Sequence, residues 1–384
     1  MAVTKIFHVL LLFILPFQKV YAAAKGKAKI LFNFYFQDGT GGDQIYSNSK
    51  KEEVDVIEPM LFVDYQIDKE TNISAHVVFD TWTAASDTEI DGNTGASGSG
   101  IDRQSRTSGR FSYKKDVVTH AWSTSVGVSS EYDYQSLNFG GNWEGRFAEN
   151  NFTLSLSPQV FLDQAKDFDL QTQKTTDFKG RFIGSMDISA SQLLTATDVI
   201  QFGYTYIYMN GMMNNISNTV KVLSNPYGNT YSRIEERMPS QRNRHALSTK
   251  FVHAFTDEAA AHVSYRYYTD DWKVQADTVE LGWRFSLFED NAFLMPTFRY
   301  YNQKKGASFY KRTFANVENS MTSDSDLAVF EGHRYGVHYS HILGDRNWFK
   351  QDIYDFGLSI GTYAYKRSNN MDYYITQFSV YAEF

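Results

Sequence analysis

The chain has 384 residues and a formal net charge of −7, with 37 Lys and Arg, 44 Asp and Glu, and no Cys. The acidic balance argues against a nucleic-acid partner, and the absence of Cys excludes disulfides, thiolate metal sites and covalently attached c-type haem. Aromatic residues make up 16% of the chain, a high share that is typical of outer-membrane β-barrels, whose aromatic girdles mark both membrane interfaces.

The N-terminus has the parts of a secretory signal peptide. Lys5 precedes an apolar run at 6–17, and a small-residue cleavage pattern ends at Ala22. The run is too short to cross a bilayer as a helix, and nothing after Ala22 extends it, which disfavours the alternative of an N-terminal membrane anchor. We therefore expect a signal peptide at 1–22 and one folded, exported domain at 23–384.

Segments in which apolar and polar residues alternate recur along the rest of the chain. The clearest lie at 30–37, 73–79, 152–163, 200–208, 279–287 and 354–361. A period of two is typical of β-strands that have one apolar and one polar face. Joined in order, the segments give about sixteen strands, a count with an uncertainty of about two strands. Closure of an antiparallel barrel requires an even number of strands.

The connections between these segments sort by length. Short turns are expected at 69–72, 114–116, 148–151, 256–258, 289–291 and 344–347, and long loops near 38–52, 87–104, 164–176, 211–239 and 303–326. With a periplasmic N-terminus, the short turns all fall on the periplasmic side and the long loops outside. The sequence therefore predicts an all-β fold, a closed antiparallel transmembrane β-barrel, rather than a soluble sandwich, whose loops would not sort by side.

The last segment, 374–384, also alternates, and it ends on the aromatic residue Phe384. A last strand that closes on Phe resembles the signal by which bacterial outer-membrane proteins are recognised for insertion. We therefore expect the barrel-insertion machinery to recognise Phe384. We expect the finished barrel to lie in the lipid of a Gram-negative outer membrane, with both chain ends in the periplasm.

Charged residues gather on the face that the alternation turns toward the lumen. The residues with this parity are Arg242, Arg244, Arg266, Arg284, Arg299, Arg334, Glu280 and Asp355. Opposed charges across a lumen create a transverse field that orders polar solutes and filters ions, so these residues are candidates for a constriction that favours anions. The alternative is an ordinary polar interior, in which neighbouring Arg and Glu side chains neutralise one another across strands.

The sequence shows no constellation suited to catalysis or metal binding. Ser340 precedes His341, but adjacent residues of a strand face opposite sides, so this pair cannot meet. No pair of His stands at ligand spacing on one face with carboxylate support. The acidic loop at 87–104 could bind Ca²⁺ through oxygens, although a solvated loop is the simpler explanation. We expect no enzyme activity, no cofactor and no metal site.

Five further blocks stand out, at 91–97, 129–136, 224–227, 235–244 and 265–272. They read DGNTGAS, SSEYDYQS, SNPY, EERMPSQRNR and YRYYTDDW. Together they resemble the family catalogued as domain of unknown function 3570. The resemblance implies an outer-membrane barrel, sometimes encoded beside a small lipoprotein, a thioredoxin-like protein and a flavin-attaching enzyme, and it implies no established activity. One departure is that Gln275-Ala276-Asp277-Thr278 lacks the His expected before the Thr.

These blocks also have local structural explanations. Pro239 can stand at the first residue of a strand, where its missing N–H does no harm. The stretch 269–272 reads as a tight hairpin in which Asp270 and Asp271 accept hydrogen bonds from backbone amides, with Trp272 at the membrane interface. For these residues we favour maintenance of the fold over contact with a ligand.

Two functions from different classes remain. The first is a porin-like channel for small polar or anionic solutes, because about sixteen strands leave an aqueous lumen unless something plugs it. The second is a barrel scaffold that houses or docks a periplasmic protein or small lipoprotein, as a redox partner in flavin-linked extracytosolic electron transfer. A loop folded into the lumen would discriminate between them, and the loop at 211–239 is long enough to be one.

Overall fold

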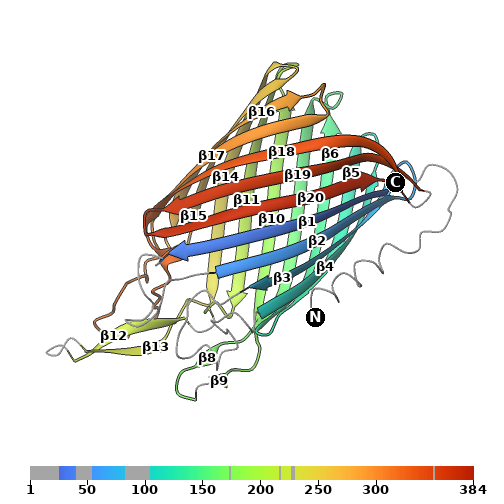
Figure 1. Ribbon diagram of the computed structural model, residues 1–384. Helices are drawn as coiled ribbons and strands as arrows, with labels where there is room; N and C mark the ends of the chain where they lie inside the picture. The colour runs from blue at the N-terminus through green and yellow to red at the C-terminus, as the bar shows by residue number, and fades with distance from the viewer. Residues whose placement is uncertain are drawn as a thin grey trace.

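The structure, a computed structural model, describes residues 26–39, 54–82, 104–172, 174–215, 218–225, 230–348 and 351–384. Sixteen strands form one closed antiparallel barrel (Figure 1), which confirms the predicted fold class and strand number. In order around the barrel they are β1 (Gly26–Gly39), β2 (Val54–Gln66), β3 (Thr71–Trp82), β4 (Gln104–Asp116), β5 (His120–Ser130), β6 (Tyr134–Phe147), β7 (Phe152–Ala165), β10 (Lys179–Leu193), β11 (Asp198–Gly211), β14 (Gln241–Thr256), β15 (Ala259–Asp270), β16 (Gln275–Leu287), β17 (Ala292–Lys305), β18 (Phe330–Trp348), β19 (Gln351–Arg367) and β20 (Met371–Glu383).

Some predicted features fall outside the described residues. These are the signal peptide at 1–22, the predicted loop at 38–52 beyond Gly39, the block at 91–97, and the acidic residues of the loop at 87–104, namely Asp87, Glu89, Asp91 and Asp102. Within the described part of the chain, no helix is long and apolar enough to span a membrane.

The barrel closes where its first strand meets its last. β1 pairs with β20 from Lys27, opposite Glu383, to Gly39, opposite Met371. Beyond β20, the backbone of Phe384 exchanges two hydrogen bonds with Gly26, at 2.7 Å and 2.8 Å. The two described ends of the chain therefore lie side by side, and the described barrel has no open edge.

The two ends of the barrel differ in their connections. The end at which Gly26 and Phe384 lie, which we call the short-turn end, carries the connections 67–70, 117–119, 148–151, 194–197, 257–258, 288–291 and 349–350. The opposite end, which we call the long-loop end, carries 40–53, 83–103, 131–133, 166–178, 212–240, 271–274, 306–329 and 368–370. The predicted long loops at 164–176, 211–239 and 303–326 share this end, as expected, whereas those at 38–52 and 87–104 lie almost wholly outside the described residues. Three short connections also lie at the long-loop end.

The sequence and the structure differ at several turns. Residues 114–116, predicted as a turn, are the end of β4, and the turn follows at 117–119. Residues 344–347 lie within β18, whose register against β19 slips around Gly344 and Arg346. Gly344 has a φ of +83°. The turn-like residues at 344–347 therefore form an irregular stretch of strand and not a turn. The turn at 194–197 is not predicted, because it contains no Gly, Pro, Asn or Asp. There the Thr195 hydroxyl accepts the Thr197 N–H at 3.1 Å.

The outer face of the barrel is apolar and exposed. Phe111, Val126 and Phe139 lie opposite one another on β4, β5 and β6 and are 49%, 41% and 48% exposed. Ile360 and Phe378 form the same kind of row on β19 and β20. The residues that alternate with these side chains face the interior. The strand pattern therefore places the apolar face outside and the polar face inside, the reverse of a water-soluble barrel.

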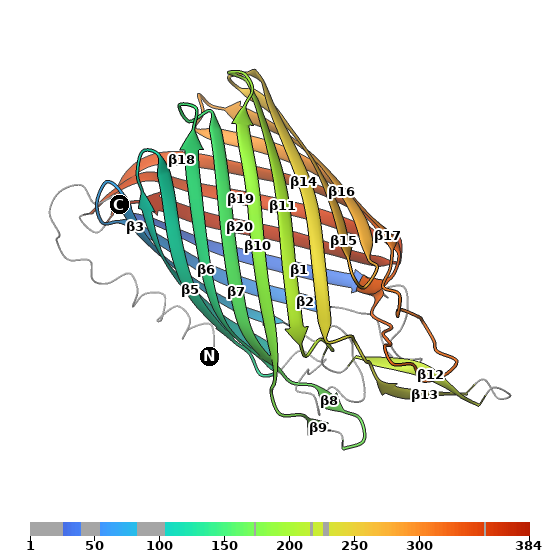
Figure 2. The same ribbon diagram turned by 180° about the vertical axis from the view of Figure 1, so that it is seen from behind.

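Small elements lie beyond the long-loop end (Figures 1 and 2). They are the paired strands β8 (Phe168–Asp169) and β9 (Lys174–Thr175), the paired strands β12 (Thr219–Asn225) and β13 (Thr230–Glu235), and the 3-10 helix η1 (Ser325–Leu327). The hairpin of β12 and β13 projects away from the barrel in both views. This hairpin, which belongs to the long loop predicted at 211–239, therefore lies outside the lumen.

Candidate functional site

Four of the six predicted lumen arginines meet in one chamber at the long-loop end. Arg242 and Arg244 on β14, Arg266 on β15 and Arg299 on β17 line a cavity of about 490 Å³. The cavity is completed by Arg181, Met209, Met213, Asn215, Met238, Tyr268, Trp272, Val274, Thr278, Tyr301, Gln303, Asp324, Asp326, Leu327 and Phe330. Because these residues come from several strands and two long connections, the chamber exists only in the closed barrel.

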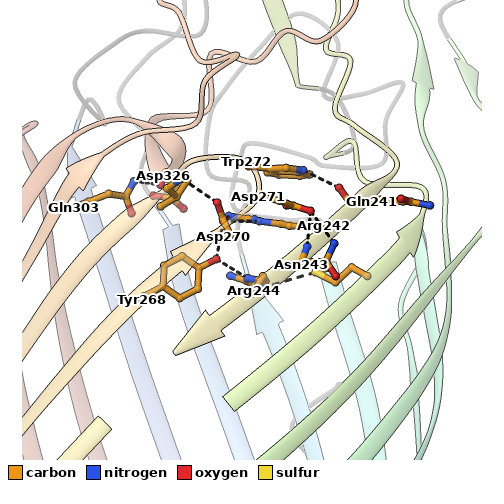
Figure 3. A network of polar contacts seen from close by, with 12 residues as sticks. Gln241, Arg242, Asn243, Arg244, Tyr268, Asp270, Asp271, Trp272, Gln303 and Asp326 are labelled. Carbon is orange, nitrogen blue, oxygen red and sulfur yellow. Dashed lines mark hydrogen bonds and ion pairs between the residues drawn. The ribbon is translucent and has the colours of Figure 1, made fainter. Parts of the chain in front are cut away.

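Arg242 is committed to a buried ion pair (Figure 3). Its Nε and Nη2 donate to one carboxylate oxygen of Asp270, at 2.9 Å and 2.5 Å, and its guanidinium lies 4.1 Å from the ring centroid of Trp272. The Tyr268 hydroxyl donates to the same oxygen at 2.8 Å. The Asp270 side chain has no exposed surface. This charge-assisted contact joins the rim of β14 to the end of β15 and leaves little of the positive charge of Arg242 for a solute.

The hairpin predicted at 269–272 is built by acidic side chains and lies two residues further on, at 271–274. The second carboxylate oxygen of Asp270 accepts the Val274 N–H at 2.9 Å. Asp271 accepts the backbone N–H and the side-chain amide of Asn243, at 3.0 Å and 2.8 Å. Both aspartates therefore hold the hairpin in place, as the sequence predicts.

The connections 212–240 and 306–329 fold against this hairpin and against each other, and we call this unit the loop cap. Its two cores contain Met213, Trp272, Val274, Ala307, Phe309 and Leu327 in one case, and Val220, Val222, Phe314 and Met321 in the other. Trp272 is 5% exposed, and its Nε1 donates to the Gln241 carbonyl at 2.8 Å. The prediction that Trp272 lies at the membrane interface is therefore wrong, because two distant connections cover its ring.

A buried carboxylate joins the two halves of the loop cap. Glu236 is 2% exposed, and it accepts the Asn215 N–H at 2.6 Å and the Thr322 hydroxyl at 2.9 Å. No Lys or Arg of the described chain pairs with it. Burial raises the pKa of Glu236 to about 7. The contact between the two connections is therefore coupled to the protonation of one side chain.

The other arginines on the β14–β17 wall of the chamber lack a carboxylate partner. Arg244 donates to the Tyr268 hydroxyl at 2.8 Å and approaches the Met209 sulfur at 3.9 Å. Within the described ranges, the guanidinium groups of Arg266 and Arg299 form no ion pair or hydrogen bond. Their positive charge is therefore available to a solute in the chamber.

Glu280 and Arg334 are the pair in which charge is neutralised. Glu280, Arg299 and Arg334 stand in one row across β16, β17 and β18. The Arg334 Nη2 donates to Glu280 at 3.0 Å, so this pair follows the alternative in which lumen charges cancel across strands. Arg299, between them, keeps its charge. The row as a whole is therefore positive.

Arg284 and Asp355 lie apart from this group. The guanidinium of Arg284, on the part of β16 toward the short-turn end, lies 4.6 Å from the ring centroid of Phe293. Asp355 has a φ of +47° at a bulge where the register of β19 against β20 slips after Tyr354, and its N–H donates to the Asp345 carboxylate at 3.2 Å. The alternation does not continue through the bulge, so Asp355 does not join the arginines as its parity predicts.

Acidic residues that the sequence analysis does not single out lie on the opposite wall. Asp80 on β3 and Glu58 on β2 flank Arg106, whose Nη2 lies 2.5 Å and 3.9 Å from their carboxylates. In strand order, β3 stands half way round the ring from β15, the strand of Arg266. The alternation could have identified Asp80. Val77 is exposed on the outer face, and a residue at an odd spacing from it on the same strand, such as Asp80, faces the lumen. The lumen thus has a wall rich in arginine and, opposite it, a wall with two carboxylates around one guanidinium.

Ser340 and His341 have different partners. The Ser340 hydroxyl lies 3.1 Å from the Tyr381 hydroxyl, whereas His341 Nδ1 lies 2.9 Å from the Tyr339 hydroxyl. The two side chains therefore do not form a nucleophile and base pair. In the ranges that the structure describes, no group of three or more His, Cys, Asp or Glu is arranged to hold a metal ion.

Comparison with known proteins gives a family. Residues 92–372 match the model of a family described as "Protein of unknown function (DUF3570)", and no curated protein matches the chain. The outer membrane protein OpdK from Pseudomonas aeruginosa is similar at 6% identity and a TM-score of 0.43, with 94% of this chain and 98% of that chain covered. A BenF-like porin from Pseudomonas fluorescens Pf-5 is similar at 8% identity and a TM-score of 0.44, with 94% and 99% covered.

Proposed function

The chain belongs to the family described as Protein of unknown function (DUF3570), and we propose that it is a porin-like channel of the bacterial outer membrane for small anionic or polar solutes. In this proposal residues 1–22 are a signal peptide that is removed on export. Lipid surrounds the outer face, the short-turn end lies in the periplasm and the long-loop end faces the outside, the arrangement usual for bacterial outer-membrane barrels.

The outer face supports a membrane location. Large side chains such as Phe111 on β4, Phe139 on β6 and Phe378 on β20 stand exposed on the outside of a described barrel that has no open edge. Burying one such side chain in an apolar phase is worth roughly 1.5–3 kcal/mol. A closed sheet also satisfies its backbone hydrogen bonds without water, which a protein in lipid requires.

The observation that carries the preference for anions is the state of Arg266 and Arg299. Both line the chamber, and the guanidinium of neither is paired within the described chain. A solute with a negative charge can complete the hydrogen bonding of these groups, whereas a cation is repelled. Asp80 and Glu58 on the opposite wall add a transverse field, which orients a polar solute as it passes.

Planar bilayers containing the purified protein test the proposal. We expect salt-dependent single-channel steps and, across a KCl gradient, a reversal potential that shows preference for chloride. The double variant Arg266→Gln with Arg299→Gln should lose most of this preference. Arg346→Gln removes the same kind of charge from an exposed residue at the short-turn end, and it should change the reversal potential much less.

The contrary result favours the scaffold. A correctly inserted barrel that gives no steps, and that co-purifies with a coloured, flavin-containing or lipoprotein partner, would replace the channel by a protein that houses a redox partner. A conducting barrel that prefers potassium would leave the channel but overturn the role given to the arginines.

A further inference from the structure

The chamber at the long-loop end has two chemically different sides. The strands of the barrel supply Arg244, Arg266 and Arg299. The loop cap and the hairpin beside it supply Met213, Met238, Trp272, Val274 and Leu327. Four of these residues belong to the apolar core of the cap, namely Met213, Trp272, Val274 and Leu327, and Met238 packs against that core. The packing of the cap therefore holds this side of the chamber in place.

The acidic residues of the cap do not neutralise the arginines of the barrel wall. Asp326 pairs with Arg367 at 2.5 Å. Asp324 accepts the Asp326 N–H at 2.9 Å and the Asn215 side-chain amide at 3.1 Å, contacts that hold η1 and the loop cap together. Burial, with Asp326 nearby, raises the pKa of Asp324. The chamber therefore keeps a positive side and an apolar side.

The volume of the chamber suits a small organic molecule. Its volume of about 490 Å³ lies within the range of roughly 300–1,000 Å³ that small-molecule sites occupy. Inorganic anions would leave the apolar side without a contact. Methionine side chains, which are flexible and polarizable, fit apolar bodies of differing shape, and Met209, Met213 and Met238 all line the chamber.

We infer that the chamber is a binding site for amphipathic organic carboxylates, with the carboxylate held by Arg266 and Arg299 and an apolar ring or chain held against the cap by Met238 and Leu327. Arg244, already hydrogen-bonded to Tyr268, supplies a further donor at the edge of the site. The inference rests on the proposed function, because it takes the chamber to be the part of the lumen through which solutes pass.

Equilibrium binding separates this site from conduction. Isothermal titration calorimetry of the full-length barrel in detergent would use 3-phenylpropionate, together with propionate, which lacks the ring, and 3-phenylpropanamide, which lacks the charge. We expect 3-phenylpropionate to bind at least about 10-fold more tightly than either, because only it meets both sides of the chamber.

Variants assign each side of the ligand to its wall. Arg266→Gln with Arg299→Gln should weaken 3-phenylpropionate about 10-fold or more and leave the weak binding of the amide unchanged. Met238→Gln, which keeps the length of the side chain, should weaken 3-phenylpropionate and leave propionate unchanged. Arg346→Gln, the charge control outside the chamber, should change none of the three.

Two results overturn the inference. One is equal affinity for 3-phenylpropionate and propionate, which would show that the apolar side makes no contact. The other is an affinity for 3-phenylpropionate that the double arginine variant does not change. If the barrel conducts chloride and yet binds none of the carboxylates, the site fails while the channel stands. If it binds 3-phenylpropionate as expected but gives no channel steps, the channel fails while the site stands.

Discussion

Arg299 and Arg334 lie directly opposite each other on β17 and β18, so two positive charges share one face of the lumen wall. Like charges in such a pair destabilise a sheet. Glu280 stands opposite Arg299 on its other side and reaches Arg334 at 3.0 Å. One carboxylate therefore lies beside two guanidinium groups. The row of Glu280, Arg299 and Arg334 keeps a net positive charge, while Glu280 reduces the repulsion between its two arginines.

Replacing Glu280 by Gln should strengthen the preference for anions and weaken the barrel slightly. The variant removes the negative charge from the row, so the reversal potential in a KCl gradient should move further toward that of chloride. The loss of stability should stay below about 1 kcal/mol, because the paired side chains are 23% and 41% exposed and solvent screens them. Glu289→Gln, in an exposed short turn, is the control, and an equal shift in both variants would contradict the expectation.

Replacing Asp270 by Ala should destabilise the barrel strongly. The Asp270 side chain is fully buried and that of Arg242 is 12% exposed, so the variant leaves a guanidinium without its partner, which costs about 3–5 kcal/mol. Urea unfolding in lipid vesicles, followed by tryptophan fluorescence, measures the loss. Asp271→Ala removes a neighbouring but exposed carboxylate and should cost less than about 1 kcal/mol. Equal losses of unfolding free energy in the two variants would show that the buried ion pair of Asp270 and Arg242 contributes no more than the exposed contacts of Asp271.

The loop cap should loosen as the pH rises through about 7, the pKa of Glu236. Folding raises this pKa from 4.5, so the folded form binds the proton more tightly, and stability is highest below 4.5 and falls until the pH passes 7. The shift corresponds to about 3 kcal/mol. Asn215, Thr322 and Asp324 face the carboxyl group and none of them is basic.

Trypsin cleavage at Lys311 and Arg312 reports this opening. Glu236→Gln stays neutral at every pH, so the ratio of wild-type to variant cleavage rates cancels the pH dependence of the protease itself. The ratio should be near 1 at about pH 5.5 and rise several-fold by about pH 8.5. A ratio that stays constant across this range would remove Glu236 as the cause.

Shortening or altering the C-terminus should lower the yield of inserted barrel. Deleting Phe384 removes two backbone hydrogen bonds to Gly26 as well as the aromatic ring. Phe384→Ala keeps the backbone and removes only the ring, which covers Gly26, so the two variants separate closure from recognition by the insertion machinery. Heat-modifiable protein in the outer-membrane fraction is the measure. Phe378→Ala, which changes an exposed aromatic of β20, should insert normally. Normal insertion of both Phe384 variants would refute a role for Phe384.

Regular strands could be predicted from the chain, and irregular ones could not. The alternation at 152–163 and 279–287 corresponds to β7 and β16, and the turn at 148–151 lies where it is predicted, because the period of two depends only on neighbouring residues. The bulge at Asp355 shifts the parity of the strand before it. A bulge is set by pairing with β18 and β20, and the sequence of β19 alone does not contain that information.

The candidate site divides in the same way. The inward parity of Arg242, Arg244, Arg266 and Arg299 follows from the alternation, yet their neighbours decide what each can do: Asp270 neutralises Arg242, while Arg266 and Arg299 stay unpaired within the described chain. Asp270 has the same lumen parity in sequence as these arginines, and nothing local distinguishes a carboxylate that pairs from one that does not.

By itself, the sequence determined that this chain is a closed barrel with an apolar outside, a charged inside and its long loops at one end, because alternation and turn length are local properties. Only the tertiary structure decided that the connections 212–240 and 306–329 fold into one cap, that this cap buries Trp272 and Glu236, and that its apolar side faces the unpaired arginines. Those contacts join residues far apart in the chain, and their free energy comes from burial that no single segment can achieve alone.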